Sequence, residues 1–191
     1  MALFHFPCVL CFPDDDEVVC GQWHRVLYLA YVGAYAFGAA DTFASEIGVL
    51  SRAPPRMVGS WRVVPRGTNG GVSALGTAAA ALGGLLVGAS GSLSFRVPDG
   101  LCFDWSVALT GRVVGLAGPT LDSVLGATLQ YSGAKPAPGS PGGVVVVVVA
   151  APGKDVQHIA GRNVLSNTGV NFVACLASAL LAPLLCCTTL F

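Results

Sequence analysis

The sequence predicts an all-α, polytopic membrane protein with about four transmembrane helices. The 191 residues have a mean hydropathy of +0.69. Only 10% of them are charged, whereas a soluble domain carries about 25%. Four apolar stretches are long enough to cross a bilayer, which takes roughly 20 helical residues: Val26–Leu50, Val72–Ser92, Val113–Tyr131 and Gly169–Phe191. The formal net charge of 0 gives no reason to expect a nucleic-acid partner.

Residues 1–21 precede the first predicted span and differ from the rest of the chain. They combine a short apolar piece, interrupted by Pro7, with the acidic run DDDE at 14–17. We expect a poorly ordered or non-family segment here, and a multi-pass membrane domain over residues 22–191.

The first span carries two carboxylates, Asp41 and Glu46. A carboxylate at the centre of a spanning helix costs about 2.5–3.5 kcal/mol, so the pair predicts a buried polar site that binds a cation. Five residues separate them, about 140° around the helix axis, so both reach one cation only if the helix unwinds near Gly48. The alternative is two carboxylates hydrogen-bonded to Ser, Thr or Arg at a helix end.

A glycine-rich turn, VPRGTNGGVS at 64–73, opens the second span. Glycine lets a backbone approach a ligand closely. Thr68 or Asn69 would cap the following helix, whose free N–H groups attract anions. The turn and its neighbours predict a phosphate-binding loop, and a plain turn with arginines that set membrane orientation is the alternative. The further candidates are Arg52, Arg56, Arg66, Gly67, Gly70 and Gly71.

Within the second span, Gly84 and Gly88 form a GxxxG pattern, which is typical of close helix packing in lipid. In the third span, Gly118-Pro119 predicts a break, with Asp122 in the first turn of a new half-helix where the dipole favours its charge. Broken helices at membrane depth often line a site. The alternative is a proline kink with Asp122 paired to Arg112 or to backbone.

The loop 132–168 reads as a flexible linker, GAKPAPGSPGG, followed by a low-complexity insert of six valines that favour a strand. Beyond it, Asn163, Asn167 and Asn171 are spaced four apart and predict one amide stripe on a helix. Amides there either bind a ligand or hold helices together. An excess of Lys and Arg in loops 51–71 and 132–168 places both loops on the cytosolic or stromal side.

Several motifs follow one another in a fixed order: ADTFASEIGVLS, PPR, VPRGTNGGVS, LDSVLGATLQYSG, HIAGR and N-x-x-x-N. Over about residues 22–182 this set resembles the transmembrane protein 19 family of multi-pass proteins, whose plant and cyanobacterial relatives include the phytyl-phosphate kinase of vitamin E synthesis. ADTFASEIG also resembles the D-x-x-A-x-x-x-G box of CTP-dependent phytol and dolichol kinases. Family members have further spans before this first one, so the resemblance implies an N-terminally shortened member. The family also tends to read Asp-Asn-Asn where this chain has Ser166-Asn167-Thr168.

The resemblance implies phosphoryl transfer from a nucleoside triphosphate to a prenyl, phytyl-like monophosphate at the membrane. Such a transfer needs Mg²⁺, which prefers one or two carboxylates plus phosphates and water. Asp41, Glu46 and Asp122 would hold the metal. Asn167 and Asn171 would orient substrate or metal.

Two other classes of function stay open at this point. One is a membrane transporter or ion-coupled exchanger, in which buried carboxylates couple ions to substrate. The other is a non-catalytic membrane protein. The lipid bilayer is the expected partner in each case. The sequence leaves open the oligomeric state and the choice between chloroplast and endoplasmic reticulum.

Overall fold

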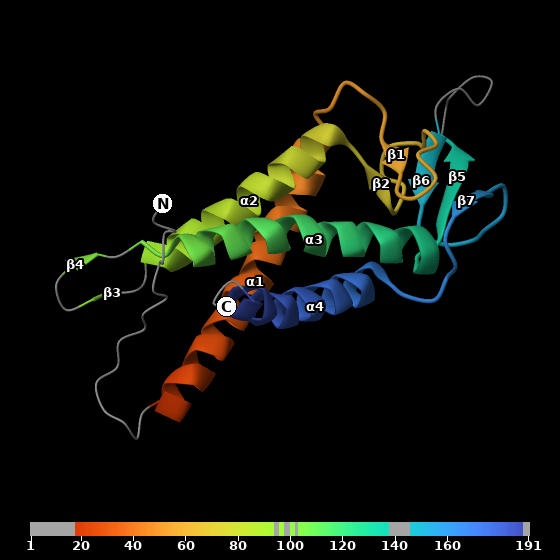
Figure 1. Ribbon diagram of the computed structural model, residues 1–191. Coiled ribbons are helices and arrows are strands. Elements are labelled where there is room, and N and C mark those ends of the chain that lie inside the picture. Colours follow the sequence, from red (N-terminus) through yellow and green to blue (C-terminus); the bar gives the residue numbers. More distant parts are fainter. Residues whose placement is uncertain (1–17, 94–95, 98–99, 102, 138–145, 189–191) are drawn as a thin grey trace.

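The computed structural model describes residues 18–93, 96–97, 100–101, 103–137 and 146–188. Four long helices dominate this part of the chain and confirm the predominantly helical class (Figure 1). They are α1 (Val18–Gly48), α2 (Ala74–Leu93), α3 (Trp105–Leu129) and α4 (Asn167–Thr188). Helix α1 begins eight residues before the predicted span, inside the segment expected to be poorly ordered. Residues 1–17 lie outside the described residues.

Three of the four helices are long and apolar enough to cross a membrane: His24–Gly48, Ala74–Leu93 and Asn167–Leu185. The predicted span at 113–131 corresponds to α3, which is equally long but does not reach that apolarity over the described residues. Helix α3 carries Arg112 and Asp122, and it packs against each of the other three helices. It therefore has the length of a span, with one face packed against the other helices and another, which includes Arg112 and Val113, exposed.

The predicted break at Gly118-Pro119 is wrong, because α3 continues through Pro119. Both residues are buried. A methyl group on Gly118 would lie 2.6 Å from the Phe37 ring and 2.6 Å from the Ser178 hydroxyl. Contacts from α1 and α4 thus surround this turn, and neighbouring helices of this kind let a proline remain within a membrane helix.

Glycines form the contact between α2 and α3. Gly84 and Gly88 of α2 face Gly111 and Gly115 of α3, and all four are buried. A methyl group on Gly111 would lie 2.6 Å from the Gly84 carbonyl oxygen, and one on Gly115 would lie 2.6 Å from the Gly84 Cα. The helix packing expected from the GxxxG pattern is present, and α3 supplies a second GxxxG that completes it.

Short strands occupy segments that the sequence analysis assigned to loops. Strand β5 (Ser132–Pro136) lies between β6 (Val146–Val149) and β7 (Gln157–Ala160), and all pairs are antiparallel. The linker predicted from 133 onward is therefore a strand at its start. The strand expected from the valine run is present as β6, and residues 138–145 lie outside the described residues. Two shorter antiparallel pairs complete the described strands: β1 (Arg56–Met57) with β2 (Gly71–Val72), and β3 (Arg96–Val97) with β4 (Gly100–Leu101).

The two long loops lie together at one end of the helices, beside the end of α3 (Figure 1). Asn69 connects them, since its backbone N–H donates to the Ser132 hydroxyl at 3.0 Å and its amide donates to the Tyr131 carbonyl at 3.2 Å. Arg62 donates to the Ile159 carbonyl at 2.5 Å. A small apolar core of Met57, Val64 and Ala160 joins the same segments. We call this unit, residues 51–73, 130–137 and 146–166, the cap.

The arrangement predicts a topology that cysteine labelling can check. In a chain whose own cysteines have been replaced, Arg56→Cys and Lys154→Cys should react with a membrane-impermeant thiol reagent from the same side, because both lie in the cap. Leu93→Cys, at the far end of α2, should react from the other side. Labelling of positions 56 and 154 from opposite sides would contradict this arrangement.

The glycine contact predicts a difference between two single methyl additions. Gly111→Ala should destabilise the protein by about 1–3 kcal/mol, because the added methyl meets the backbone of α2. Gly38→Ala is the matched control, since its methyl on α1 meets nothing within 4 Å, and it should be neutral or stabilising by up to about 1 kcal/mol. Thermal unfolding in detergent measures both. Equal unfolding midpoints for the two variants would mean that the helices do not depend on this contact.

Candidate functional site

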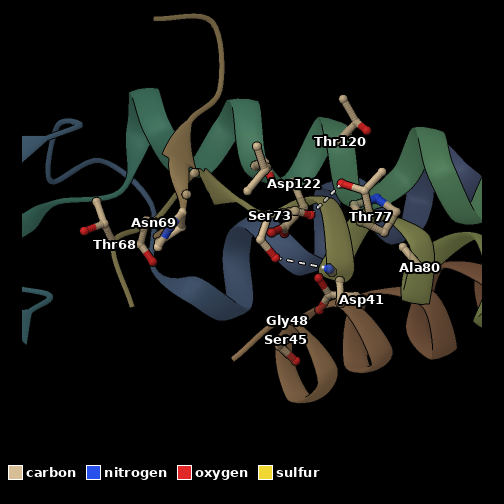
Figure 2. A pocket seen from close by; sticks show the side chains of 18 of the residues that line it. Asp41, Ser45, Gly48, Thr68, Asn69, Ser73, Thr77, Ala80, Thr120 and Asp122 are labelled. Carbon is tan, nitrogen blue, oxygen red and sulfur yellow. Dashed lines mark hydrogen bonds between the residues drawn. The ribbon is translucent and has the colours of Figure 1, made fainter. Parts of the chain in front are cut away.

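A cavity of about 300 Å³ lies where α1 ends, α2 begins and the second half of α3 passes (Figure 2). Three helices and the glycine-rich loop contribute to its wall. Asp41 comes from α1, Ser73 precedes α2, and Asp122 comes from α3. The cavity is therefore built from segments that the sequence analysis picked out separately.

Asp41 and Asp122 face each other across this cavity from different helices. Both are half-buried, and they are close enough for their charges to interact. Among the described residues, no basic side chain forms an ion pair with either carboxylate. Two like charges in a partly buried site repel each other, so the pair favours a bound cation.

A hydrogen bond from α4 positions the Asp122 side chain. The Asn171 amide donates to Asp122 Oδ1 at 3.0 Å and to the Asn167 carbonyl at 3.0 Å. The Asn167 side chain in turn accepts a hydrogen bond from Gln130 at 3.4 Å. Neither asparagine lines the cavity. The predicted stripe of three amides on one helix is wrong for Asn163, which lies in a turn before α4 begins. Asn171 and Asn167 act on Asp122 and on helix packing.

Ser166 occupies the place where the resembling family tends to have Asp. Its hydroxyl accepts the backbone N–H of Gly169 at 3.2 Å, so it caps the start of α4. Asp and Ser are both favoured N-cap residues.

Glu46 lies outside the cavity. Helix α1 stays helical to Gly48, so the unwinding that would bring Asp41 and Glu46 to one cation is absent. Glu46 is exposed, while Ser45, four residues after Asp41, shares the cavity with it. The described residues contain no group of three or more His, Cys, Asp or Glu placed to hold a metal ion. The structure thus brings together two of the three predicted carboxylates.

The glycine-rich loop forms one wall of the cavity. All of Gly67, Thr68, Asn69, Gly70 and Gly71 line it. Gly70 has φ +78, and a methyl group there would lie 2.5 Å from the Ala127 side chain of α3. Only glycine combines this backbone conformation with this close approach, so Gly70 brings the loop against α3.

The expected capping by Thr68 or Asn69 is wrong. The buried Thr68 hydroxyl donates to the Pro65 carbonyl at 2.7 Å. The Asn69 side-chain amide donates to the Tyr131 carbonyl at 3.2 Å. Ser73 is the N-terminal capping residue of α2, because its hydroxyl accepts the Gly76 N–H at 3.1 Å. A serine directly before an apolar helix is the usual sequence signal for a cap, and it would have identified Ser73.

The arginines have separate roles. Arg66 lines the cavity and donates to the Val49 carbonyl at 2.7 Å and to the Ser51 carbonyl, so it fixes the end of α1. Arg56 donates to the Trp61 carbonyl at 2.9 Å, and neither Arg56 nor Arg52 lines the cavity. One of the three predicted arginines is thus placed where it can meet a cavity-bound anion.

The two sides of the cavity differ in charge. Asp41 and Asp122 supply negative charge. Arg66 and the start of α2 supply positive charge, since the first N–H groups of a helix lack partners within it and carry the positive end of its dipole. Such a site suits a ligand that contains both a metal cation and phosphate groups. The further hydroxyls on its wall come from Ser45, Ser73, Thr77, Thr120 and Ser123.

Comparisons with known proteins agree on membrane character. The family described as "Integral membrane protein DUF92" matches residues 1–179. Protein PGR of Arabidopsis thaliana is 39% identical over 160 residues, which cover 80% of this chain and 52% of that protein. An uncharacterised membrane protein of Methanocaldococcus jannaschii is 36% identical over 105 residues, covering 55% of this chain and 41% of the relative. Another, from Synechocystis, is 34% identical over 112 residues, covering 56% and 40%.

The chain spans about half the length of the curated relatives it matches. No solved structure matches it. The family match extends over most of the chain and agrees with the apolar helices of the structure. The chain therefore belongs to the integral membrane protein family DUF92.

Proposed function

We propose that this membrane domain transfers the γ-phosphoryl group of a nucleoside triphosphate to a prenyl monophosphate. An oxygen of the lipid phosphate bonds to the γ-phosphorus, and the bond from that phosphorus to the bridging oxygen of the β-phosphate breaks. The products are a prenyl diphosphate and a nucleoside diphosphate. The observation that carries the proposal is the cavity in which Asp41 and Asp122 meet the glycine-rich loop and the start of α2.

Phosphate binding is assigned to the positive wall of the cavity. Gly67 leaves room for close approach of phosphate oxygens to the backbone, since a methyl group there would meet no atom closer than 3.9 Å. The start of α2 attracts anions through the positive end of the helix dipole, while the Gly76 N–H is already bonded to Ser73. Arg66 adds a charged donor beside them. These groups position the phosphates and neutralise part of their charge, which is most of what phosphoryl transfer asks of a protein.

The pair of carboxylates fits Mg²⁺. This ion commonly binds one or two carboxylates together with substrate phosphates and water. Asp41 and Asp122 would hold it from opposite walls, and Asn171 would keep Asp122 in place. Bound there, Mg²⁺ would neutralise charge that develops on the transferred group. Glu46, on the exposed face of α1, takes no part in this proposal.

The lipid acceptor is supported by the surroundings of the cavity and by the motifs. Three helices apolar enough to span a membrane pack against α3, and another face of α3 stays exposed, so an acceptor that lives in the bilayer can reach the site. The motif resemblance to the transmembrane protein 19 family, with its phytyl-phosphate kinase, supports a phytyl-like monophosphate.

A direct assay tests the proposal. The purified chain in lipid nanodiscs is given phytyl monophosphate, Mg²⁺ and either CTP or ATP, and the lipid products are separated. Magnesium-dependent formation of phytyl diphosphate is the expected result. Ion-dependent uptake into liposomes with no turnover of nucleotide would overturn the proposal in favour of a transporter.

Removing either cavity carboxylate should abolish transfer while leaving the fold intact. Asp41→Asn and Asp122→Asn keep shape and remove charge, and each should lower kcat/KM on the order of 100-fold or more. Their folded yield should stay level or rise, since a charge at membrane depth is unfavourable. Glu46→Gln is the matched control and should stay within a few-fold of the parent. An Asp41→Asn variant that keeps its activity but folds poorly would make Asp41 structural.

Asn171 is expected to act as a positioning residue through Asp122. Asn171→Leu keeps the size and removes the amide that donates to Asp122, so it should lower activity or metal affinity roughly 10–100-fold, as loss of a supporting hydrogen bond does in metal sites. The diagnostic measurement is the Mg²⁺ concentration at half-maximal rate, which should rise. Phe172→Leu, a neighbouring exposed residue, is the control. An unchanged Mg²⁺ dependence in Asn171→Leu would show that the amide only holds helices together.

A further inference from the structure

Six hydroxyl side chains line the cavity that holds Asp41 and Asp122, and they differ in whether their protons are already used in hydrogen bonds. Four of them donate to main-chain carbonyls three or four residues earlier in the chain. These four are Ser45, Thr68, Thr77 and Thr120, which donate to the carbonyls of Thr42, Pro65, Ser73 and Leu116. Each of these protons is therefore used within its own segment and is not available to a ligand.

The other two hydroxyls belong to Ser73 and Ser123, and their protons are free among the described residues. Ser73 accepts the Gly76 N–H at 3.1 Å, which uses an oxygen lone pair and leaves the O–H available (Figure 2). The Ser123 side chain has no hydrogen bond within the part of the chain that the structure describes. No fully buried side-chain oxygen in that part lacks a partner, so the Ser123 hydroxyl is open to the cavity or to solvent.

Ser123 lies where the carboxylates and the glycine-rich loop meet. It follows Asp122 on α3, and both residues line the cavity. A methyl group on Gly70 would lie 2.6 Å from the Ser123 carbonyl oxygen, so the loop packs directly against this residue. A ligand held between Asp122 and the loop therefore lies beside Ser123.

A free O–H group beside two carboxylates favours a ligand that brings acceptor oxygens of its own. A bare metal ion cannot accept a hydrogen bond, whereas a phosphate group that binds the metal has further oxygens that can. Hydrogen bonds to an ionised acceptor are roughly twice as strong as those between neutral groups. Ser123 and Ser73 would donate such bonds from α3 and from the start of α2, and would add two neutral donors to the charged Arg66.

We propose that Ser123 donates its hydroxyl proton to an oxygen of the metal-bound polyphosphate, with Ser73 as the second donor. This inference rests on the proposed function for the identity of the ligand. Ser123 is then a binding residue that distinguishes a complex of metal and polyphosphate from the metal ion alone. Ser73 also caps α2, so its replacement would alter the start of that helix. The Ser123 side chain has no hydrogen bond to lose in the described structure, so its replacement is the cleaner test.

Equilibrium binding tests the proposal without turnover. The full chain in lipid nanodiscs is titrated with inorganic triphosphate at saturating Mg²⁺, and the heat of binding gives Kd. Ser123→Ala should raise this Kd about tenfold, as the loss of a hydrogen bond to a charged group does. Ser123→Thr keeps the hydroxyl and should stay within about threefold of the parent. The matched control is Thr128→Val, which removes an exposed hydroxyl of α3 that donates to the Val124 carbonyl and lies outside the cavity.

Three results would overturn the inference. One is a parent chain that does not bind triphosphate. Another is a Ser123→Ala variant whose Kd for triphosphate equals that of the parent. The third is a Ser123→Ala variant in which only the Mg²⁺ concentration at half-saturation rises, because the hydroxyl would then be a metal ligand. Equal thermal unfolding midpoints for Ser123→Ala and the parent show that a change in Kd reflects binding and not the fold.

The two proposals fail in different ways. A parent chain that binds triphosphate with the expected dependence on Ser123, but makes no diphosphate from a lipid phosphate, loses the proposed function and keeps the role of Ser123. A chain that makes diphosphate with the same kcat/KM in the parent and in Ser123→Ala keeps the function and loses Ser123 as a phosphate donor.

Discussion

The close approach of α2 to α3 is the constraint on which the rest of the structure depends. Inside a bilayer the lipid is as apolar as the helices, so apolar side chains do not drive helices together and small residues that permit tight packing do. Gly84 and Gly88 meet Gly111 and Gly115 with no room for a methyl group. This contact fixes the start of α2 relative to Asp122, two turns beyond Gly115 on α3. The charge distribution of the cavity is therefore set by residues that carry no charge.

The carboxylates give the cavity its character. Asp41 and Asp122 stand near each other with no basic partner among the described residues, and Asn171 is the one side chain seen to donate to either of them in that part of the chain. Unpaired charges at membrane depth are unfavourable. The Mg²⁺ ion of the proposed function would neutralise them.

The sequence identified most residues of this site correctly, but it predicted their arrangement in space less well. The unfavourable placement of charge in an apolar span pointed to Asp41 and Asp122, and glycine spacing pointed to the loop at 67–71. Two predictions were wrong: Glu46 lies outside the cavity, and α3 does not break at Pro119. Both outcomes depend on tertiary structure that no local sequence pattern contains. Helix α1 does not unwind, and α3 is enclosed at Gly118, next to Pro119, by Phe37 and Ser178, which are distant in sequence. The small β-sheet was missed because its strands are short and its central strand begins in what reads as a linker.

The cap explains why the glycine-rich loop is more than a turn between helices. Asn69 and Arg62 tie it to the strands that follow α3, while Arg66 ties it to the end of α1. The loop is thus anchored on both sides of the cavity, and its backbone is pre-organised for a ligand. Helix α3 contributes Asp122 to this polar end, and over the described residues it falls short of the apolarity that marks parts of α1, α2 and α4 as spans.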